Sequence, residues 1–236
     1  MNIAVFGASG GIGTAFIEHY LNQPTTNKVF AFTRSTLTIN HDKLVTIHVD
    51  VLNEEHLRKS MEMLDGQLLD RVVIALGTLH DDERMPEKQL TDISMTNLHD
   101  VFNINTFAPA IILKYIKPHI NKREKNVIGV LSARVGSISD NRLGGWYAYR
   151  ASKAALNMLI KCTSIEFARS HKRTVIIGLH PGTVDTGLSK PFQGRLKQGQ
   201  LFTPDYAVSQ LAEVIENSTS AQSGLCMAYD GTVIPA

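Results

Sequence analysis

Cysteine is nearly missing from this chain, and its scarcity limits what can hold the fold together. Only two cysteines occur among 236 residues, Cys162 and Cys226, and they lie far apart without metal-ligand spacing. The sequence therefore argues against a disulfide framework and favours a reducing, cytoplasmic compartment.

Metal-binding and membrane-spanning patterns are missing as well. The nine histidines show neither HxxxH nor HExxH spacing, so we expect no metal. No run approaches the roughly 18 apolar residues of a membrane span. A charge excess is also lacking, because 24 Lys and Arg against 22 Asp and Glu leave a net charge of +2. We expect neither nucleic acid nor a membrane as a partner.

The chain has instead a globular composition, with 43% hydrophobic and 19% charged residues. No repeat or linker-like tract divides it, which predicts one domain over residues 1–236. Short β-branched runs alternate with longer helical patterns and predict an α/β fold built of βαβ units around a parallel sheet. The expected strands are 2–6, 28–33, 44–49, 71–76, 126–131, 174–180 and 225–229. The expected helices are 12–21, 54–64, 97–120, 147–169, 184–196 and 204–216.

A glycine-rich stretch follows the first expected strand and opens the first expected helix. Its residues are Gly7, Ala8, Ser9, Gly10, Gly11, Ile12 and Gly13. Glycines permit a tight turn and a close approach of the backbone to a pyrophosphate, and the helix N-terminus supplies N–H groups to the anion. The stretch is therefore typical of a dinucleotide-binding loop. Its glycines fit two known nucleotide-binding spacings, Gly7-Gly11-Gly13 and Gly7-Gly10-Gly13, and do not choose between them.

The end of the second expected strand bears on the choice of dinucleotide. A carboxylate is expected there in an NAD binder, about 20 residues past the loop, to bind the ribose 2′-hydroxyl. Thr33 occupies the place and Arg34 follows. A guanidinium suits a 2′-phosphate, so the sequence predicts NADP(H) rather than NAD(H). Asp50 and Val51, after the third expected strand, are placed to border the adenine.

A tyrosine and a lysine stand four positions apart in the fifth expected helix. Tyr149 and Lys153 therefore share one helix face. A free tyrosine has a pKa of about 10, and a nearby cation would lower it and suit the phenol to proton transfer. Surface pairs with this spacing are more common than catalytic ones, so the pair gains weight only from the other motifs.

Several ordered motifs together resemble the short-chain dehydrogenase/reductase family. They are Gly7-x-x-x-Gly11-x-Gly13, Asp50-Val51, Asn103-Ile104-Asn105, Tyr149-x-x-x-Lys153 and Pro181-Gly182-Thr183-Val184-Asp185-Thr186. The amino-acid sequence of residues 131–138 and 144–150 is similar to that of the C-factor-like proteins and sniffer-type carbonyl reductases. The resemblance implies a doubly wound Rossmann fold with seven parallel strands, hydride transfer between a nicotinamide and a carbonyl or alcohol, and a homodimer or homotetramer built on the two longest helices.

The resemblance also implies site roles. Tyr149 would exchange a proton with the substrate, and Lys153 would hold the nicotinamide ribose. Asn105 would order a water beside Lys153. Val184 and Thr186 would meet the nicotinamide carboxamide.

Two stretches depart from the family pattern. The serine that polarises the substrate carbonyl is expected about 13 residues before Tyr149, where Gly136 stands. Allowing for a longer loop, the second serine of a Ser-Ser pair becomes Ala133, so we expect Ser132 to act, with Ser137 as the alternative. After the fourth strand the Asn-Asn-Ala-Gly pattern reads Ile-Ala-Leu-Gly, in which Gly77 keeps the close approach to the cofactor.

Two functions fit these residues. The first is an NADP(H)-dependent carbonyl reductase or alcohol dehydrogenase with a small-molecule substrate. The alternative is a catalytically weak dinucleotide-binding sensor or signalling protein, favoured by the displaced serine. Loops around residues 79–92 and 187–203 would enclose the substrate.

Overall fold

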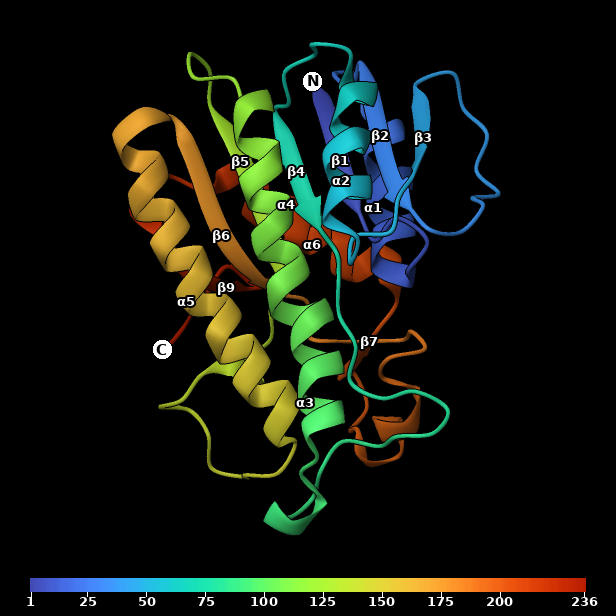
Figure 1. The fold of residues 1–236 in the computed structure, drawn as a ribbon, viewed down its shortest axis with the longest axis vertical. Helices are drawn as coiled ribbons and strands as arrows, with labels where there is room; N and C mark the ends of the chain where they lie inside the picture. Colours follow the sequence, from blue (N-terminus) through green and yellow to red (C-terminus); the bar gives the residue numbers. More distant parts are fainter.

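The computed structural model describes residues 1–236, apart from the side chain of Arg195. One eight-stranded sheet runs through the molecule in the order β10-β9-β6-β5-β4-β1-β2-β3, and a separate two-stranded pair joins β7 to β8. Figure 1 shows the central strands of the sheet side by side. The strands are β1 Asn2–Phe6, β2 Lys28–Thr33, β3 Leu44–His48, β4 Arg71–Ile74, β5 Asn126–Leu131, β6 Thr174–His180, β7 Thr183–Val184, β8 Leu201–Phe202, β9 Cys226–Ala228 and β10 Val233–Ile234.

Six α-helices cover the two faces of the sheet. They are α1 Gly11–Leu21, α2 Glu54–Ser60, α3 Met95–Phe102, α4 Ala108–Ile116, α5 Tyr147–Ser170 and α6 Pro204–Asn217. Figure 1 shows α4 and α5 crossing in front of the sheet, with α1 and α6 behind it. The described helices include none with the length and apolar character needed to cross a membrane.

The alternation of side chains along the strands creates two hydrophobic layers. In β1, Ile3 and Val5 pack among side chains of α1 and α6, whereas Ala4 and Phe6 pack among those of α2, α4 and α5. Both faces are thus buried, as a parallel sheet with helices on each side requires. The structure is a Rossmann-like α/β domain, as expected.

The sheet differs from the expectation in its strand number. Seven parallel strands were expected, but an eighth strand, β10, pairs antiparallel with β9 through Val233↔Met227 and Ile234↔Cys226. The Asp230-Gly231 turn explains the addition, because Gly231 adopts φ +80° and lets the chain reverse directly onto β9.

The expected helix 184–196 is wrong. Thr183–Val184 form β7 instead, and only a 3₁₀ segment, Lys190–Arg195, follows. Gly187, Pro191 and Gly194 explain this, because glycine and proline are the poorest helix formers.

The expected helix 97–120 is interrupted. A π-helical segment, Asn103–Phe107, separates α3 from α4, and a 3₁₀ segment, Lys117–His119, ends the run. Pro109 has no N–H, so the carbonyl of Asn105 cannot receive the regular helical bond, and Ala108 N donates to Asn103 O five positions back. The expected helix 54–64 likewise ends as α2 at Ser60, followed by the 3₁₀ segment Met61–Leu64.

The strand order fixes where a ligand can bind. From β1 the chain moves outward through β2 and β3, then returns to the other side of β1 with β4. The carboxyl ends of β1 and β4 therefore border the point where the winding reverses, which is where ligands bind in such sheets.

Candidate active site

The loop between β1 and α1 forms a tight cradle. Gly7 adopts φ +76°, and a Cβ on Gly13 would lie 2.1 Å from Gly7 O. A Cβ on Gly11 would lie 2.8 Å from Thr186 Cγ2. No side chain caps α1, whose N-cap is Gly10, so the first-turn N–H groups remain directed at whatever occupies the cradle. These features fit a dinucleotide pyrophosphate.

The end of β2 carries no carboxylate. Thr33 is buried and its hydroxyl bonds to Ser35, while Arg34 is exposed. Among the described side chains, Arg34 makes no ion pair, and its backbone oxygen contacts His48 Nε2 at 2.9 Å. The guanidinium is thus free to meet an anion at this edge of the sheet. Asp50 is partly buried just beyond β3, where its carboxylate accepts a hydrogen bond from Leu52 N.

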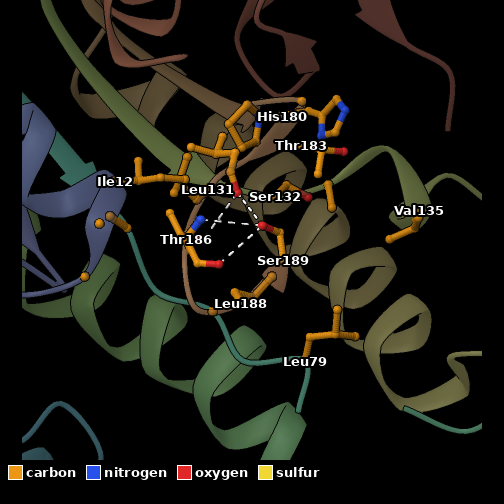
Figure 2. Close-up of a pocket in the computed structure, with 18 of the residues that line it drawn as sticks. Ile12, Leu79, Leu131, Ser132, Val135, His180, Thr183, Thr186, Leu188 and Ser189 are labelled. Atoms are coloured by element: carbon orange, nitrogen blue, oxygen red, sulfur yellow. Dashed lines mark hydrogen bonds between the residues drawn. The ribbon is translucent and has the colours of Figure 1, made fainter. Parts of the chain in front are cut away.

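A cavity of about 560 Å³ opens at the carboxyl ends of the central strands (Figure 2). It brings together nine of the expected site residues: Gly11, Ile12, Gly13, Gly77, Ser132, Tyr149, Lys153, Val184 and Thr186. Six others lie outside its lining: Gly7, Ser9, Arg34, Asp50, Val51 and Asn105. In Figure 2, Ile12 and Thr186 lie toward the glycine-rich loop between β1 and α1, whereas Leu79 and Val135 belong to the opposite part of the cavity.

Tyr149 and Lys153 lie on consecutive turns of α5, and both are buried. Lys153 Nζ donates to Leu131 O at 2.9 Å and to Leu76 O at 3.4 Å, and it lies 6.0 Å from the centre of the Tyr149 ring. Burial lowers the pKa of Lys153 to about 8 and raises the pKa of Tyr149 to about 12. The expected lowering of the Tyr149 pKa by Lys153 is therefore not found, because desolvation of the phenol dominates.

The two candidate serines differ in their access to the cavity. Ser132 lines it, but its hydroxyl donates a 2.6 Å hydrogen bond to Asn157 Oδ1. Ser137 is buried outside the lining, where its hydroxyl accepts from Asp140 N. Ala133 also lines the cavity and packs against Tyr149. Only Ser132 can approach a substrate, and its proton points toward Asn157.

Asn105 is fully buried in the π-helical segment. Its Oδ1 accepts from Thr78 N at 2.8 Å, and its Nδ2 donates to Thr78 O and to Ser152 Oγ. Oδ1 would lie 3.8 Å from a Cβ on Gly77, and Lys153 Nζ would lie 3.7 Å from the same point. The amide thus ties the loop after β4 to α5 close to the ammonium, without contacting it.

Aromatic and aliphatic side chains wall the outer part of the cavity. Trp146 lies edge-on to Tyr149 with ring centres 6.2 Å apart and packs against Phe192 at 5.0 Å. Leu79 and Leu188 belong to the same apolar cluster. The two loops expected to enclose the substrate therefore do supply part of the wall, and the wall is apolar.

A model of the family described as short chain dehydrogenase matches residues 1–196. The chain belongs to this family. A 1-hydroxy-2-glutathionyl-2-methyl-3-butene dehydrogenase from Rhodococcus sp. (strain AD45) is 32% identical over 79% of this chain and 77% of its own length. C-signal from Myxococcus xanthus is 32% identical over 62% of this chain and 82% of its own length.

Solved structures of short-chain dehydrogenases share the fold. The NADPH-bound carbonyl reductase from chicken fatty liver has a TM-score of 0.83 at 25% identity, covering 100% of this chain and 98% of that one. The carbonyl reductase Sniffer of D. melanogaster has a TM-score of 0.86 at 24% identity, covering 100% and 99%. The chain is thus a short-chain dehydrogenase/reductase with an NAD(P)-type cofactor and a small-molecule substrate, and it has C-signal and carbonyl reductase relatives.

Two residues that support this short-chain dehydrogenase site from outside the cavity lining were missed in the sequence. Asn157 holds the Ser132 hydroxyl, and Glu87 is buried against the start of α5. Asn157 lies one helical turn beyond Lys153 and so shares its face, which is a usable signal. Glu87 carries no signal, because an acidic residue in a long polar loop is ordinarily exposed. Among the described residues, no three potential metal ligands come together.

Proposed function

We propose that this protein is an NADP(H)-dependent oxidoreductase that reduces a carbonyl or oxidises the corresponding alcohol, with Tyr149 as general acid/base. One observation carries the proposal: the uncapped start of α1, Tyr149 and Lys153 all border one cavity at the switch point of the sheet. The apolar outer wall suits a substrate with an aromatic or aliphatic body.

When bound, the cofactor would supply or accept the hydride. The chain would then manage the proton and the geometry. Tyr149 would donate its phenolic proton to the carbonyl oxygen. The Lys153 ammonium would stabilise the phenolate that forms and hold the ribose hydroxyls, while Val184 and Thr186 would fix the nicotinamide ring.

The pKa of Tyr149 favours the reductive direction. A phenol with a pKa of about 12 stays protonated at neutral pH and is ready to donate. Oxidation of an alcohol would need the phenolate, which burial disfavours. We therefore propose that the protonated phenol is the form that enters catalysis, as carbonyl reduction requires.

Substitution of Tyr149 by Phe tests the proposal. The variant keeps the ring that packs against Trp146 but loses the proton, so NADPH consumption with aldehydes, ketones and quinones should fall about 100-fold or more. Binding of NADPH, measured by calorimetry, should stay within a few-fold of wild type. Equal rates of wild type and Tyr149→Phe across the panel would refute the proposal.

The preference for NADP(H) rests on Arg34 and on the lack of a carboxylate at the end of β2. The NADPH-bound carbonyl reductase of the same fold supports this choice. Arg34→Met should raise the KM for NADPH about 10- to 100-fold, as loss of a charge-assisted bond predicts. The KM for NADH, which has no 2′-phosphate, should hardly change. A similar rise for both cofactors would mean that Arg34 does not read the phosphate.

A sensor or signalling role is the second candidate. It is favoured by the Ser132 hydroxyl, which is turned toward Asn157 rather than the substrate, and by the similarity to C-signal. Such a protein would bind NADPH tightly and change its association with a partner protein on binding, with negligible turnover in every assay. Measurable turnover that depends on Tyr149 argues against it.

We propose a homodimer or homotetramer assembled through α4 and α5. Phe107, directly before α4, exposes 51% of its surface, and Met158 and Ile165 of α5 expose 63% and 49%. Exposed large apolar side chains can mark association surfaces. Light scattering should give a mass of two or four chains, and Met158→Glu should reduce it.

A cytoplasmic location is proposed from the two thiols. Cys162 is exposed and Cys226 is buried, and neither is paired. Unpaired thiols persist in a reducing compartment. Fractionation of cells that express the protein would test this.

A further inference from the structure

Glu87 is a buried carboxylate that the proposed chemistry does not use. It lies in the loop between β4 and α3 with 3% of its surface exposed, and no ion pair of the described residues involves it. Its Oε2 accepts from Ala148 N at 3.2 Å, in the first turn of α5, and its Oε1 accepts from Asn97 Nδ2 at 2.5 Å, in the first turn of α3. One carboxylate thus accepts a backbone N–H from the positive end of α5 and joins that helix to a side-chain amide of α3.

The backbone carbonyl of Glu87 holds Trp146 in an unfavourable backbone conformation. Gly144, Gly145 and Trp146 all have positive φ angles, of 62°, 62° and 50°. Glycine tolerates this conformation, but a tryptophan is strained in it and persists there only when its surroundings impose it. Trp146 N donates to Glu87 O at 2.5 Å, so the residue that caps α5 also fixes the strained N-cap of that helix.

The strained conformation has a consequence for the cavity. It directs the Trp146 ring between Tyr149 and Phe192, where the ring forms part of the apolar wall. Tyr149 follows three residues later, within the first turn of α5. A change at Glu87 would therefore reach both the wall and the phenol through one short stretch of backbone.

We propose that Glu87 is a positioning residue for the reaction: its side chain caps α5 and its backbone holds Trp146 in the left-handed conformation, so that the indole and the Tyr149 phenol face the same substrate. The inference rests on the proposed function of Tyr149. Glu87 touches neither substrate nor cofactor and acts through Trp146 and the start of α5.

The test begins with Glu87→Ala in the full chain. Turnover of an aromatic ketone should fall about 100-fold, as a displacement of about 1 Å at a reacting group predicts. Affinity for NADPH should change little, because the α1 loop lies at the other end of the cavity. Trp146 is the only tryptophan, so its fluorescence reports the wall directly. Its emission should shift to longer wavelength, and acrylamide should quench it more strongly.

Two companion variants show whether the effect of Glu87→Ala comes from the hydrogen bonds of the Glu87 side chain, from its charge, or from any substitution in this loop. Glu87→Gln can still accept from Ala148 N and can donate to the Asn97 oxygen if that amide turns, so it should restore most of the turnover and the wild-type emission. Glu83→Ala, an exposed glutamate of the same loop whose side chain has no partner in the described contacts, should match wild type in both readouts. If Glu87→Ala proves insoluble, Asn97→Ala replaces it and should shift turnover and emission in the same directions by less.

A double-substitution cycle tests the route through Trp146. In a Trp146→Gly background the strain is gone, so Glu87→Ala should cost much less turnover than in wild type. Fully multiplicative effects would overturn the proposal, as would a Glu87→Ala protein with wild-type turnover and unchanged emission. The fluorescence needs no catalysis. If the wild type shows no turnover but Glu87→Ala still shifts the Trp146 emission, the proposed function is refuted. The control of Trp146 by Glu87 would then still be supported.

Discussion

Ala133 stands beside the Tyr149 phenol at a place where the family resemblance expects a hydroxyl. It lines the cavity with 8% of its surface exposed and packs with Leu79 and Tyr149. We predict that Ala133→Ser raises kcat for ketone reduction about tenfold, because a donor aimed at the carbonyl stabilises the developing charge. Rates over a panel of ketones measure this.

The matched control is Ser132→Ala. Because the Ser132 proton is donated to Asn157, its loss should lower kcat by less than about tenfold. The opposite pattern, a loss of about 100-fold or more in Ser132→Ala with no gain in Ala133→Ser, would assign carbonyl polarisation to Ser132.

On the proposed mechanism, we expect Lys153 to set an upper pH limit for reduction. Burial lowers its pKa to about 8, so an ammonium that would stabilise the forming phenolate is present below that pH and lost above it. Tyr149, with a pKa of about 12, stays protonated throughout. We predict that kcat/KM for NADPH, which reports the free enzyme, falls about tenfold per pH unit above pH 8. Lys153→Met should be slow and show no such decline, whereas a flat wild-type profile up to about pH 10 would contradict the assignment.

At the scale of elements, the π-helical segment between α3 and α4 owes its position to Asn105. The Asn105 side-chain amide hydrogen-bonds both the N–H and the C=O of Thr78, and it also donates to the Ser152 hydroxyl. Asn105→Ala leaves these buried groups unpaired, so we predict a loss of about 1–3 kcal/mol in the free energy of unfolding. Turnover should fall too, since the loop after β4 borders Lys153.

Urea unfolding and steady-state rates measure the two effects of Asn105→Ala. Asn103→Ala is the control, because Asn103 lies in the same segment with no side-chain hydrogen bond among the described contacts. Equal losses in both variants would indicate a general weakening of the segment rather than a role for the Asn105 amide.

The sequence predicted best the short apolar strands at the centre of the sheet. The strands 2–6, 28–33, 126–131 and 174–180 agree with β1, β2, β5 and β6 to the residue, because a short, mostly buried apolar run suits a strand covered on both faces. The helix 184–196 was wrong, and the break before Pro109 was not expected. Both depend on local glycine and proline geometry that competes with the apolar pattern.

The candidate site was predictable where a motif fixes spacing and unpredictable where a tertiary contact decides. Tyr149, Lys153 and the α1 loop meet at one cavity because the strand order brings them there. The hydrogen bond from Ser132 to Asn157 and the burial of Glu87 depend on side-chain directions, which spacing does not encode. The same is true of the Tyr149 pKa, which burial raises.

At the scale of the whole molecule, the candidate active-site cavity and the buried Arg71–Glu216 ion pair lie at opposite ends of the sheet. The cavity lies at the carboxyl ends of the strands, whereas Arg71 begins β4 at the other end. The Arg71 guanidinium is buried and pairs with Glu216 at the end of α6, with Nε–Oε1 and Nη2–Oε2 distances of 2.8 and 2.5 Å. The pair ties α6 to the sheet far from the cavity.

This separation predicts that stability and catalysis can be changed independently. Glu216→Ala leaves the Arg71 charge buried without its partner, so the free energy of unfolding should fall by about 1–3 kcal/mol, moderated because the Glu216 side chain is 41% exposed. The Tm should drop about 2–4 °C for each kcal/mol, while kcat and KM stay at wild-type values. Glu213→Ala, an exposed change on the same helix, should alter neither. Replacing both partners, Arg71→Met with Glu216→Leu, should recover most of the loss because no charge is left buried. A fall in kcat that follows the Tm in Glu216→Ala would instead show that α6 transmits its anchoring to the cavity.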